Sequence, residues 1–146
     1  MRPGSKFGEM VDVLFLSPPR RADGSNYLFN NATLSLASYL HRHGLDVRVE
    51  PLVGPTWPEQ LEKAVLKYEP RWVAVSCKWW DTLFGATEVA RRVKLVKPDC
   101  KVVVGGQTAT SYASEIVRNT CIDAVIMGDG EVPLLELVQG KPSCNL

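Results

Sequence analysis

Small residues end three successive hydrophobic runs of this sequence, and they indicate binding rather than catalysis. Ser76, Gly105-Gly106 and Gly128-Asp129-Gly130-Glu131 each directly follow an apolar segment typical of a buried strand. In a parallel α/β sheet, the carboxyl ends of the strands share one edge, where ligands bind. Glycine has no Cβ atom, so a flat group can approach its backbone closely. The three segments therefore predict one shared cavity for a large, flat ligand.

Side chains that ligate metals or transfer protons are not gathered near these strand ends. The cysteines (Cys77, Cys100, Cys121 and Cys144) are widely spaced and include no Cys-x-x-Cys pair for zinc or an iron–sulfur cluster. His41 and His43 fall at the end of the first predicted helix, which faces the opposite edge of the sheet. We therefore expect no metal ligand and no catalytic residue from this chain, which would bind a ligand rather than act alone as an enzyme.

Strand-like and helix-like segments alternate along the chain. The predicted strands are continuously apolar, as parallel strands buried on both faces are, and amphipathic helices separate them. This alternation predicts an α/β fold: a five-stranded, doubly wound parallel sheet of flavodoxin-like (Rossmann-like) order 2-1-3-4-5, with helices on both faces. The strands are expected at 11–16, 45–50, 71–76, 101–104 and 123–127, and the helices at about 32–43, 57–68, 82–96, 111–117 and 131–140.

Capping signals and one long connection complete this prediction. Thr56 with Glu59 forms a capping-box pattern, and Gly44 is placed to end the first helix in the left-handed conformation. Ser111 is the expected cap of the short helix through Val117. Residues 17–31 connect the first strand to the first helix, where about 2 to 6 residues would be usual. A loop this long at the ligand-binding edge is expected to be functional.

Length and composition describe one soluble domain. The chain has 146 residues, of which 45% are hydrophobic and 23% charged, with a formal net charge of +1. That charge creates no field to attract nucleic acid or an anionic membrane, and no apolar run approaches a membrane span. We expect residues 1–10 to be a disordered lead without signal-peptide character, 11–140 the domain and 141–146 a tail or linker. A cytoplasmic location is expected.

Three common uses of this fold are disfavoured by the strand ends. A dinucleotide fingerprint needs a third glycine, which residues 105–110 lack, and Pro133 stands in its place after the fifth strand. No Walker-type Gly-Lys-Ser/Thr sequence occurs. A phospho-receiver needs acidic residues where this chain has Ser17-Pro18-Pro19 and Ser76-Cys77-Lys78.

The order of these motifs resembles that of the cobalamin-binding domain at the amino terminus of many radical S-adenosylmethionine enzymes. The similarity covers about residues 11–140. Its parts are the opening strand and Pro-Pro turn (11–19), the first helix with the following strand (34–47), the fourth-strand turn (105–110) and the fifth-strand turn (128–134).

Cobalamin domains carry Ser-x-Leu and, at a set distance, Gly-Gly. Here Ser76-Cys77-Lys78 is followed by 26 residues (79–104) and then Gly105-Gly106, with Lys78 in place of leucine. The resemblance implies that Ser76 hydrogen-bonds the dimethylbenzimidazole tail and that Gly105-Gly106 admits the tail and ribose. The full set of implied cofactor-binding residues is Ser17, Pro18, Tyr27, Ser76, Lys78, Trp79, Gly105, Gly106, Gln107, Thr108, Gly128, Gly130 and Glu131.

One signature of other cobalamin proteins, Asp-x-His-x-x-Gly, is missing, because Asp23-Gly24 has no accompanying histidine. The resemblance therefore implies cobalamin bound base-off and without a histidine ligand. The lower cobalt face would be covered by the 17–31 loop, with Tyr27 and Arg20 or Arg21 as contacts. Many relatives have histidine where this chain has Thr108.

The radical-SAM cluster motif, Cys-x-x-x-Cys-x-x-Cys, does not occur in this sequence. The resemblance thus implies that a [4Fe-4S] cluster and S-adenosylmethionine are bound by a separate carboxyl-terminal radical SAM domain of the same parent chain. That parent is expected to be a methyltransferase acting on a small molecule or peptide, although a stand-alone corrinoid module is an alternative. A corrinoid-free docking or substrate-shaping module also stays open because of Lys78 and Thr108, and a flavin or nucleotide binder is the least favoured.

Overall fold

The structure, a computed structural model, describes residues 10–19 and 31–141. The predicted lead, most of the long loop and most of the tail lie outside these residues. The strands are β1 (Val13–Leu16), β2 (Val47–Glu50), β3 (Trp72–Ser76), β4 (Lys101–Gly105) and β5 (Ala124–Ile126). The helices are α1 (Asn31–Arg42), α2 (Trp57–Tyr68), α3 (Trp80–Val96), α4 (Gln107–Ser111), α5 (Ala113–Asn119) and α6 (Glu131–Val138).

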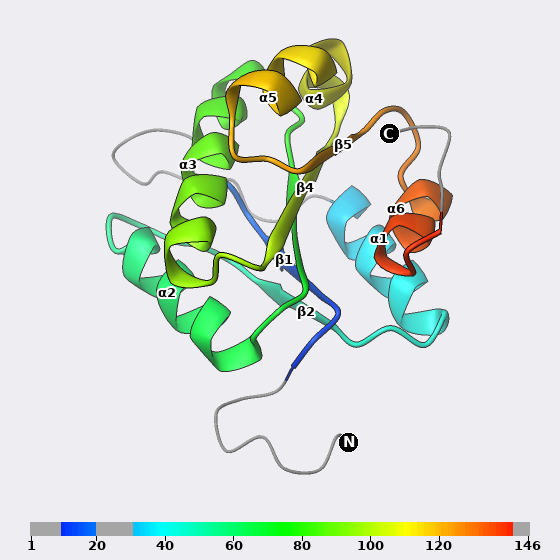
Figure 1. Ribbon diagram of the computed structural model, residues 1–146, viewed down its shortest axis with the longest axis horizontal. Coiled ribbons are helices and arrows are strands. Elements are labelled where there is room, and N and C mark those ends of the chain that lie inside the picture. Colours follow the sequence, from blue (N-terminus) through cyan, green and yellow to red (C-terminus); the bar gives the residue numbers. More distant parts are fainter. Residues whose placement is uncertain (1–9, 20–30, 142–146) are drawn as a thin grey trace.

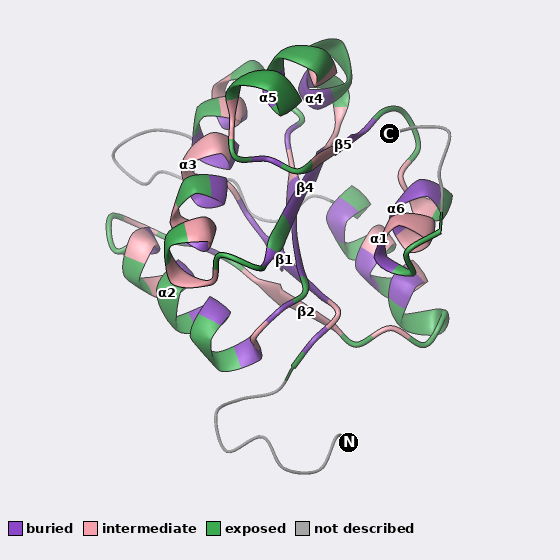
Figure 2. Ribbon diagram, in the orientation of Figure 1, coloured by how far each residue is buried: buried purple, intermediate pink, exposed green. Residues whose placement is uncertain are grey.

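The five strands form one parallel sheet in the order β2-β1-β3-β4-β5, which confirms the predicted fold class. Helices α2 and α3 cover one face of the sheet, and α1 and α6 cover the other (Figure 1). Each face has its own hydrophobic core, because side chains of one strand alternate between the two layers. The central strands are almost wholly buried, whereas α4 and α5 are largely exposed (Figure 2).

One of the predicted helices is wrong. The segment expected to be one short helix capped by Ser111 is two helices, α4 and α5, which meet at Tyr112. Ser111 ends α4, and its hydroxyl donates to the carbonyl of Gln107 at 3.1 Å rather than capping α5. In α5 the buried residue is Ile116, while Val117 is exposed. Helix α3 begins at Trp80, within two residues of the approximate start that was expected, and ends at Val96 as expected.

The expected caps are partly confirmed. Thr56 is the residue before α2, but its hydroxyl makes no cap hydrogen bond and instead accepts from Gln60 Nε2 at 3.0 Å. Gly44 follows α1 with a φ of 84°, as the predicted left-handed cap requires.

The start of the β1–α1 connection is packed tightly against α3. An added Cβ at Gly85, in the middle of α3, would overlap the carbonyl oxygen of Pro19. Glycine is therefore required there, although it is unfavourable inside a helix. This contact fixes where the long connection leaves the sheet. No helix among the described residues is long and apolar enough to cross a membrane.

We expect Gly85→Ala to destabilise the fold by roughly 1–3 kcal/mol, because the new methyl group meets the Pro19 carbonyl. Urea unfolding followed by circular dichroism measures this, with Leu95→Ala, at an exposed position of the same helix, as the control. At a glycine with free space, the same substitution would instead stabilise the helix by about 1 kcal/mol. A higher free energy of unfolding for Gly85→Ala would therefore contradict the close contact between Gly85 and Pro19.

Candidate ligand-binding site

The predicted strand-end residues meet in one cavity at the carboxyl edge of the sheet. Ser76 and Gly105 are directly paired between β3 and β4, and Gly128-Asp129-Gly130-Glu131 closes the cavity from the end of β5. The opposite wall comes from the first turns of α1, including Thr33 and Leu36, and from Leu134 of α6. The sequence prediction of a shared cavity is confirmed.

The cavity has a volume of about 210 Å³, below the roughly 300–1,000 Å³ of a site that encloses a whole drug-sized ligand. Its walls are mostly apolar, with Phe15, Val103 and Ile126 in the floor. Polar groups come from Ser76, Thr33 and the Asp129–Glu131 segment. The cavity is therefore suited to one planar, largely apolar group at the end of a larger ligand.

Gly105 and Gly106 differ in whether the fold has room for a side chain. A Cβ at Gly105 would meet only Ile126, at 3.8 Å from its oxygen and 3.9 Å from its Cβ, so the protein itself leaves that space open. Gly106 has a φ of 108°, and a Cβ there would lie 2.8 Å from the backbone carbon and oxygen of Cys77. Gly106 is thus required by the fold, whereas the space beside Gly105 is open.

The fifth-strand glycines also differ. Gly128 has a φ of 76°, which favours glycine, and its N–H donates to the Thr110 hydroxyl at 3.2 Å. Gly130 precedes α6, and a Cβ there would lie 3.4 Å from Leu36 Cδ2. Gly130 thereby allows α6 to begin close to α1, at the rim of the cavity.

A second, more open cavity of about 780 Å³ adjoins the first. The two cavities share Gly106, Gly128 and Asp129, so they form a continuous depression. Besides the shared Gly106 and Gly128, four further predicted residues line this second part: Lys78, Trp79, Gln107 and Thr108. The Lys78 ammonium lies 5.3 Å from the Trp79 ring, at cation–π distance, and this tryptophan is 51% exposed.

Thr108 has a structural role that its sequence position did not reveal. Its hydroxyl donates to the Lys78 carbonyl at 3.1 Å, and its N–H donates to the Cys77 carbonyl at 3.2 Å. The Cys77 N–H in turn donates to the Gly105 carbonyl at 2.6 Å. These hydrogen bonds hold the turn between β3 and α3 in a fixed position relative to the turn between β4 and α4.

Two predicted residues, Ser17 and Pro18, are not brought to the cavity. The Ser17 hydroxyl is buried and accepts a hydrogen bond from the Leu52 N–H at 2.9 Å, which ties the end of β1 to the segment after β2. Ser17 and Pro18 line neither part of the depression. Tyr27, like Arg20 and Arg21, lies outside the described residues.

The histidines lie where the sequence placed them. Helix α1 begins at the cavity and runs away from it, so His41 is about 14 Å farther along the helix axis than the cavity-lining Ala32. His43 Nδ1 is 2.8 Å from the Tyr39 carbonyl oxygen, at the far end of α1. In the part of the chain that the structure describes, no three His, Cys, Asp or Glu side chains gather to hold a metal.

Cys77 is next to the cavity, and its thiol is buried. Burial raises its pKa above the ordinary value, and this outweighs the lowering by the Thr82 hydroxyl, whose oxygen is 3.7 Å from the sulfur. The raised pKa keeps Cys77 protonated at neutral pH. It therefore acts as an apolar packing residue and not as a nucleophile or metal ligand.

The sequence reasoning missed the α1 and α6 walls, formed by Ala32, Thr33, Leu36 and Leu134. All four lie in the first turns of helices that follow strand ends, so the rule that selected the strand-end glycines would also have selected them.

The fold and this depression define a flavodoxin-like domain that binds a ligand at the carboxyl edge of its sheet. The sequence model of the family described as B12 binding domain matches residues 22–138. The chain therefore belongs to the B12 binding domain family and is a cobalamin-binding domain. The resemblance inferred from the order of motifs is confirmed. No curated protein sequence matches the chain.

Three solved structures share the fold. A novel cobalamin-binding protein from Desulfitobacterium hafniense DCB-2 has a TM-score of 0.63 and 14% identity, covering 90% of this chain and 59% of that one. The cobalamin-dependent S-adenosylmethionine radical enzyme OxsB, solved with aqua-cobalamin bound, has a TM-score of 0.66 and 15% identity, covering 93% and 20%. An uncharacterized protein from Neptuniibacter caesariensis has a TM-score of 0.61 and 15% identity, covering 91% and 90%.

We expect Gly105→Leu to leave the domain folded but to weaken corrinoid binding about 10- to 100-fold, because the side chain fills the open slot beside Ile126. Titration of hydroxocobalamin followed by its visible spectrum measures the affinity. Lys101→Leu, at the other end of β4, is the control and should bind normally.

Gly106→Ala should instead lose stability, because of its positive φ and its contact with Cys77. Unchanged binding by Gly105→Leu would contradict this assignment.

We expect iodoacetamide to modify Cys121 in the folded protein while Cys77 and Cys100 react only after unfolding. Cys121 is exposed, whereas burial raises the pKa of Cys77 and raises that of Cys100 to about 11. Mass spectrometry of peptides from a Cys144→Ser background identifies the modified residues. Equal native labelling of Cys77 and Cys121 would show that the site is open to solvent at Cys77.

Proposed function

We propose that this chain binds cobalamin base-off and without a histidine ligand, as the cobalamin-binding domain of a radical SAM methyltransferase. The observation that carries the proposal is the open slot at Gly105, beside Ser76 and lined by apolar side chains. Of the two adjacent glycines, Gly105 has no packing contact that forbids a side chain, so a ligand accounts for its glycine.

The dimensions and chemistry of the cavity fit the nucleotide tail of cobalamin. Dimethylbenzimidazole is planar and mostly apolar, and the ring nitrogen released from cobalt would need a hydrogen-bond donor. The Ser76 hydroxyl lines the cavity and would supply that donor, while Gly105 leaves room beside it. A tail in this cavity would place the rest of the ligand over the adjoining part with Lys78, Trp79 and Gln107.

When bound, cobalamin supplies a cobalt–carbon bond from which a methyl group can be transferred. The chain's own residues would hold its tail and leave cobalt without a protein imidazole, since His41 and His43 lie at the opposite end of α1. Ser17, Pro18 and Tyr27 were predicted contacts, and the Ser17 hydroxyl is occupied by Leu52. The lower cobalt face would be covered by the 17–31 loop, with Tyr27 and Arg20 or Arg21, which lie outside the described residues, as the candidate contacts.

Support for a second domain comes from exposed aromatic residues at the same edge. Trp80 is 80% exposed, Phe84 on the next turn of α3 is 58% exposed, and Tyr112 is 51% exposed. Exposed groups of large apolar residues mark protein interaction sites. We propose that residues 11–140 form the cobalamin unit and that a radical SAM domain of the same parent, with its [4Fe-4S] cluster and S-adenosylmethionine, packs over this edge. The fivefold longer OxsB chain is consistent with such an arrangement.

Retention of hydroxocobalamin by the purified chain after desalting tests the binding itself. We expect a stoichiometric visible spectrum. A corrinoid-free docking module would instead elute colourless, and that result would overturn the proposal.

We expect the EPR spectrum of the bound cob(II)alamin form to lack nitrogen superhyperfine splitting, because neither the tail nor an imidazole ligates cobalt. The His41→Ala/His43→Ala variant should give the same spectrum, since these residues lie away from the cavity. Splitting that disappears in this variant would show histidine ligation and contradict the histidine-off assignment.

A further inference from the structure

The outer side of β5 is an open strand edge. β5 ends the sheet and pairs only with β4, and the Asp123 N–H donates to the Val102 carbonyl at 2.9 Å. Because backbone groups alternate in direction along a parallel strand, those of Asp123 and Val125 face β4, and those of Ala124 and Ile126 face outward. Within residues 10–19 and 31–141, no other strand pairs with this edge.

A groove of about 830 Å³ along this edge is lined by residues of β5, α5 and α6. In the ribbon, β5 lies between α5 and α6 (Figure 1). It shares no lining residue with the cobalamin cavity. Part of its lining is apolar, with Val117 of α5 and Met127 after β5 exposed. An extended peptide in this groove could form hydrogen bonds with the outward backbone groups of β5. Its apolar side chains could contact Val117 and Met127.

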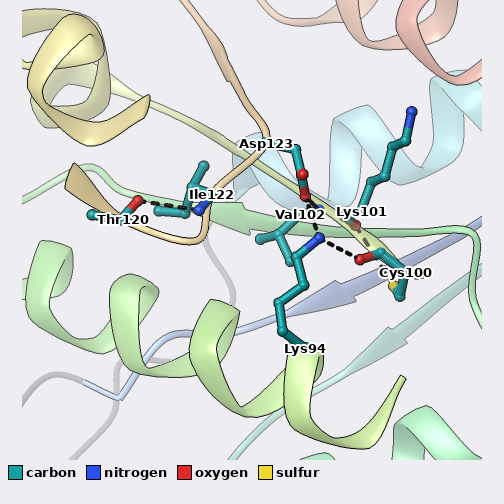
Figure 3. Close-up of polar contacts among 7 residues, drawn as sticks. All are labelled: Lys94, Cys100, Lys101, Val102, Thr120, Ile122 and Asp123. Atoms are coloured by element: carbon teal, nitrogen blue, oxygen red, sulfur yellow. Dashed lines mark hydrogen bonds and ion pairs between the residues drawn. The ribbon is translucent and has the colours of Figure 1, made fainter. Parts of the chain in front are cut away.

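Positively charged side chains also line the groove. Lys101, Arg118 and Lys141 line it and are exposed, and none of them has an ion pair with a described residue. The carboxylate in the groove, Asp123, accepts from Lys94 Nζ at 2.7 Å and from the Val102 N–H at 2.8 Å, so its charge is already neutralised (Figure 3). The Lys101 side chain extends away from that carboxylate (Figure 3).

We propose that this groove binds an extended, acidic peptide segment of a partner protein, which adds as a strand to β5. Main-chain hydrogen bonds to Ala124 and Ile126 would supply affinity, as in other strand additions. Apolar residues of the segment would lie against Val117 and Met127, and its acidic residues against the three cations.

Protection of the strand edge and pairing with a second copy both fit the groove less well. Lysines on edge strands often serve to prevent pairing, but β5 itself (Ala124–Ile126) has neither a charge nor a proline, so its edge is not blocked. A second copy pairing across a two-fold axis would leave the cations of both copies without carboxylates. An acidic segment satisfies the open backbone groups and the charges together.

A fluorescein-labelled peptide of sequence VTVTEDE, measured by fluorescence anisotropy at low salt, tests the proposal. We expect saturable binding, and Arg118→Glu/Lys141→Glu should weaken it about tenfold, since each exposed ion pair contributes modestly. Lys63→Glu/Lys67→Glu, the same charge change on α2, is the control and should bind normally. The peptide VTVTKKK, and VTVTEDE with alternate backbone nitrogens methylated, should not bind.

Amide exchange gives a second readout, because peptide binding should slow exchange at Ala124 and Ile126. Absence of VTVTEDE binding, equal binding of the methylated peptide, or preferential binding of a single-stranded RNA oligonucleotide would overturn the proposal. So would a concentration-dependent dimer that Arg118→Glu/Lys141→Glu abolishes. Hydroxocobalamin retention by this variant should be unchanged, so failure here is distinguishable from failure of cobalamin binding.

Discussion

The ligand site depends on one interlock, between the turns that follow β3 and β4. Gly106 lies against the Cys77 carbonyl without room for a side chain, and the Cys77 N–H donates to the Gly105 carbonyl at 2.6 Å. Thr108 completes the interlock by donating to the carbonyls of Cys77 and Lys78. Because these contacts fix both turns, Ser76 and Gly105 lie side by side with an open slot between the sheet and α1. A preorganised slot of this kind reduces the entropic cost of binding a ligand.

Under the proposed function, the same geometry explains which chemistry this domain would leave to another domain. The slot admits one planar group, and its nearest thiol, Cys77, stays protonated because it is buried. The histidines lie a helix length away. A domain built in this way can hold a cofactor and present it at an edge, where Trp80 and Phe84 offer a surface for the domain that would use it.

Much of the fold could be predicted because it depends on local patterns: apolar runs such as Val102–Val104 predict buried parallel strands wherever they occur. Ser76 and Gly105 were found for the same reason, since strand ends share an edge. The functions of Gly85, Gly106 and Ser17 could not be predicted, because each depends on a partner distant in sequence (Pro19, Cys77 and Leu52). The predicted cap at Ser111 was wrong because a serine shortly before apolar residues gives the same sequence pattern whether it begins one helix or ends another.

The central claim is that the Gly105 slot holds the nucleotide tail of cobalamin. Comparing the affinities of the chain for hydroxocobalamin and for cobinamide, which lacks that tail, tests it most directly. The account predicts that cobinamide binds at least about tenfold more weakly, a loss of roughly 1.4 kcal/mol or more. Equal affinity for the two corrinoids would show that the slot is not used by the tail and would contradict the account.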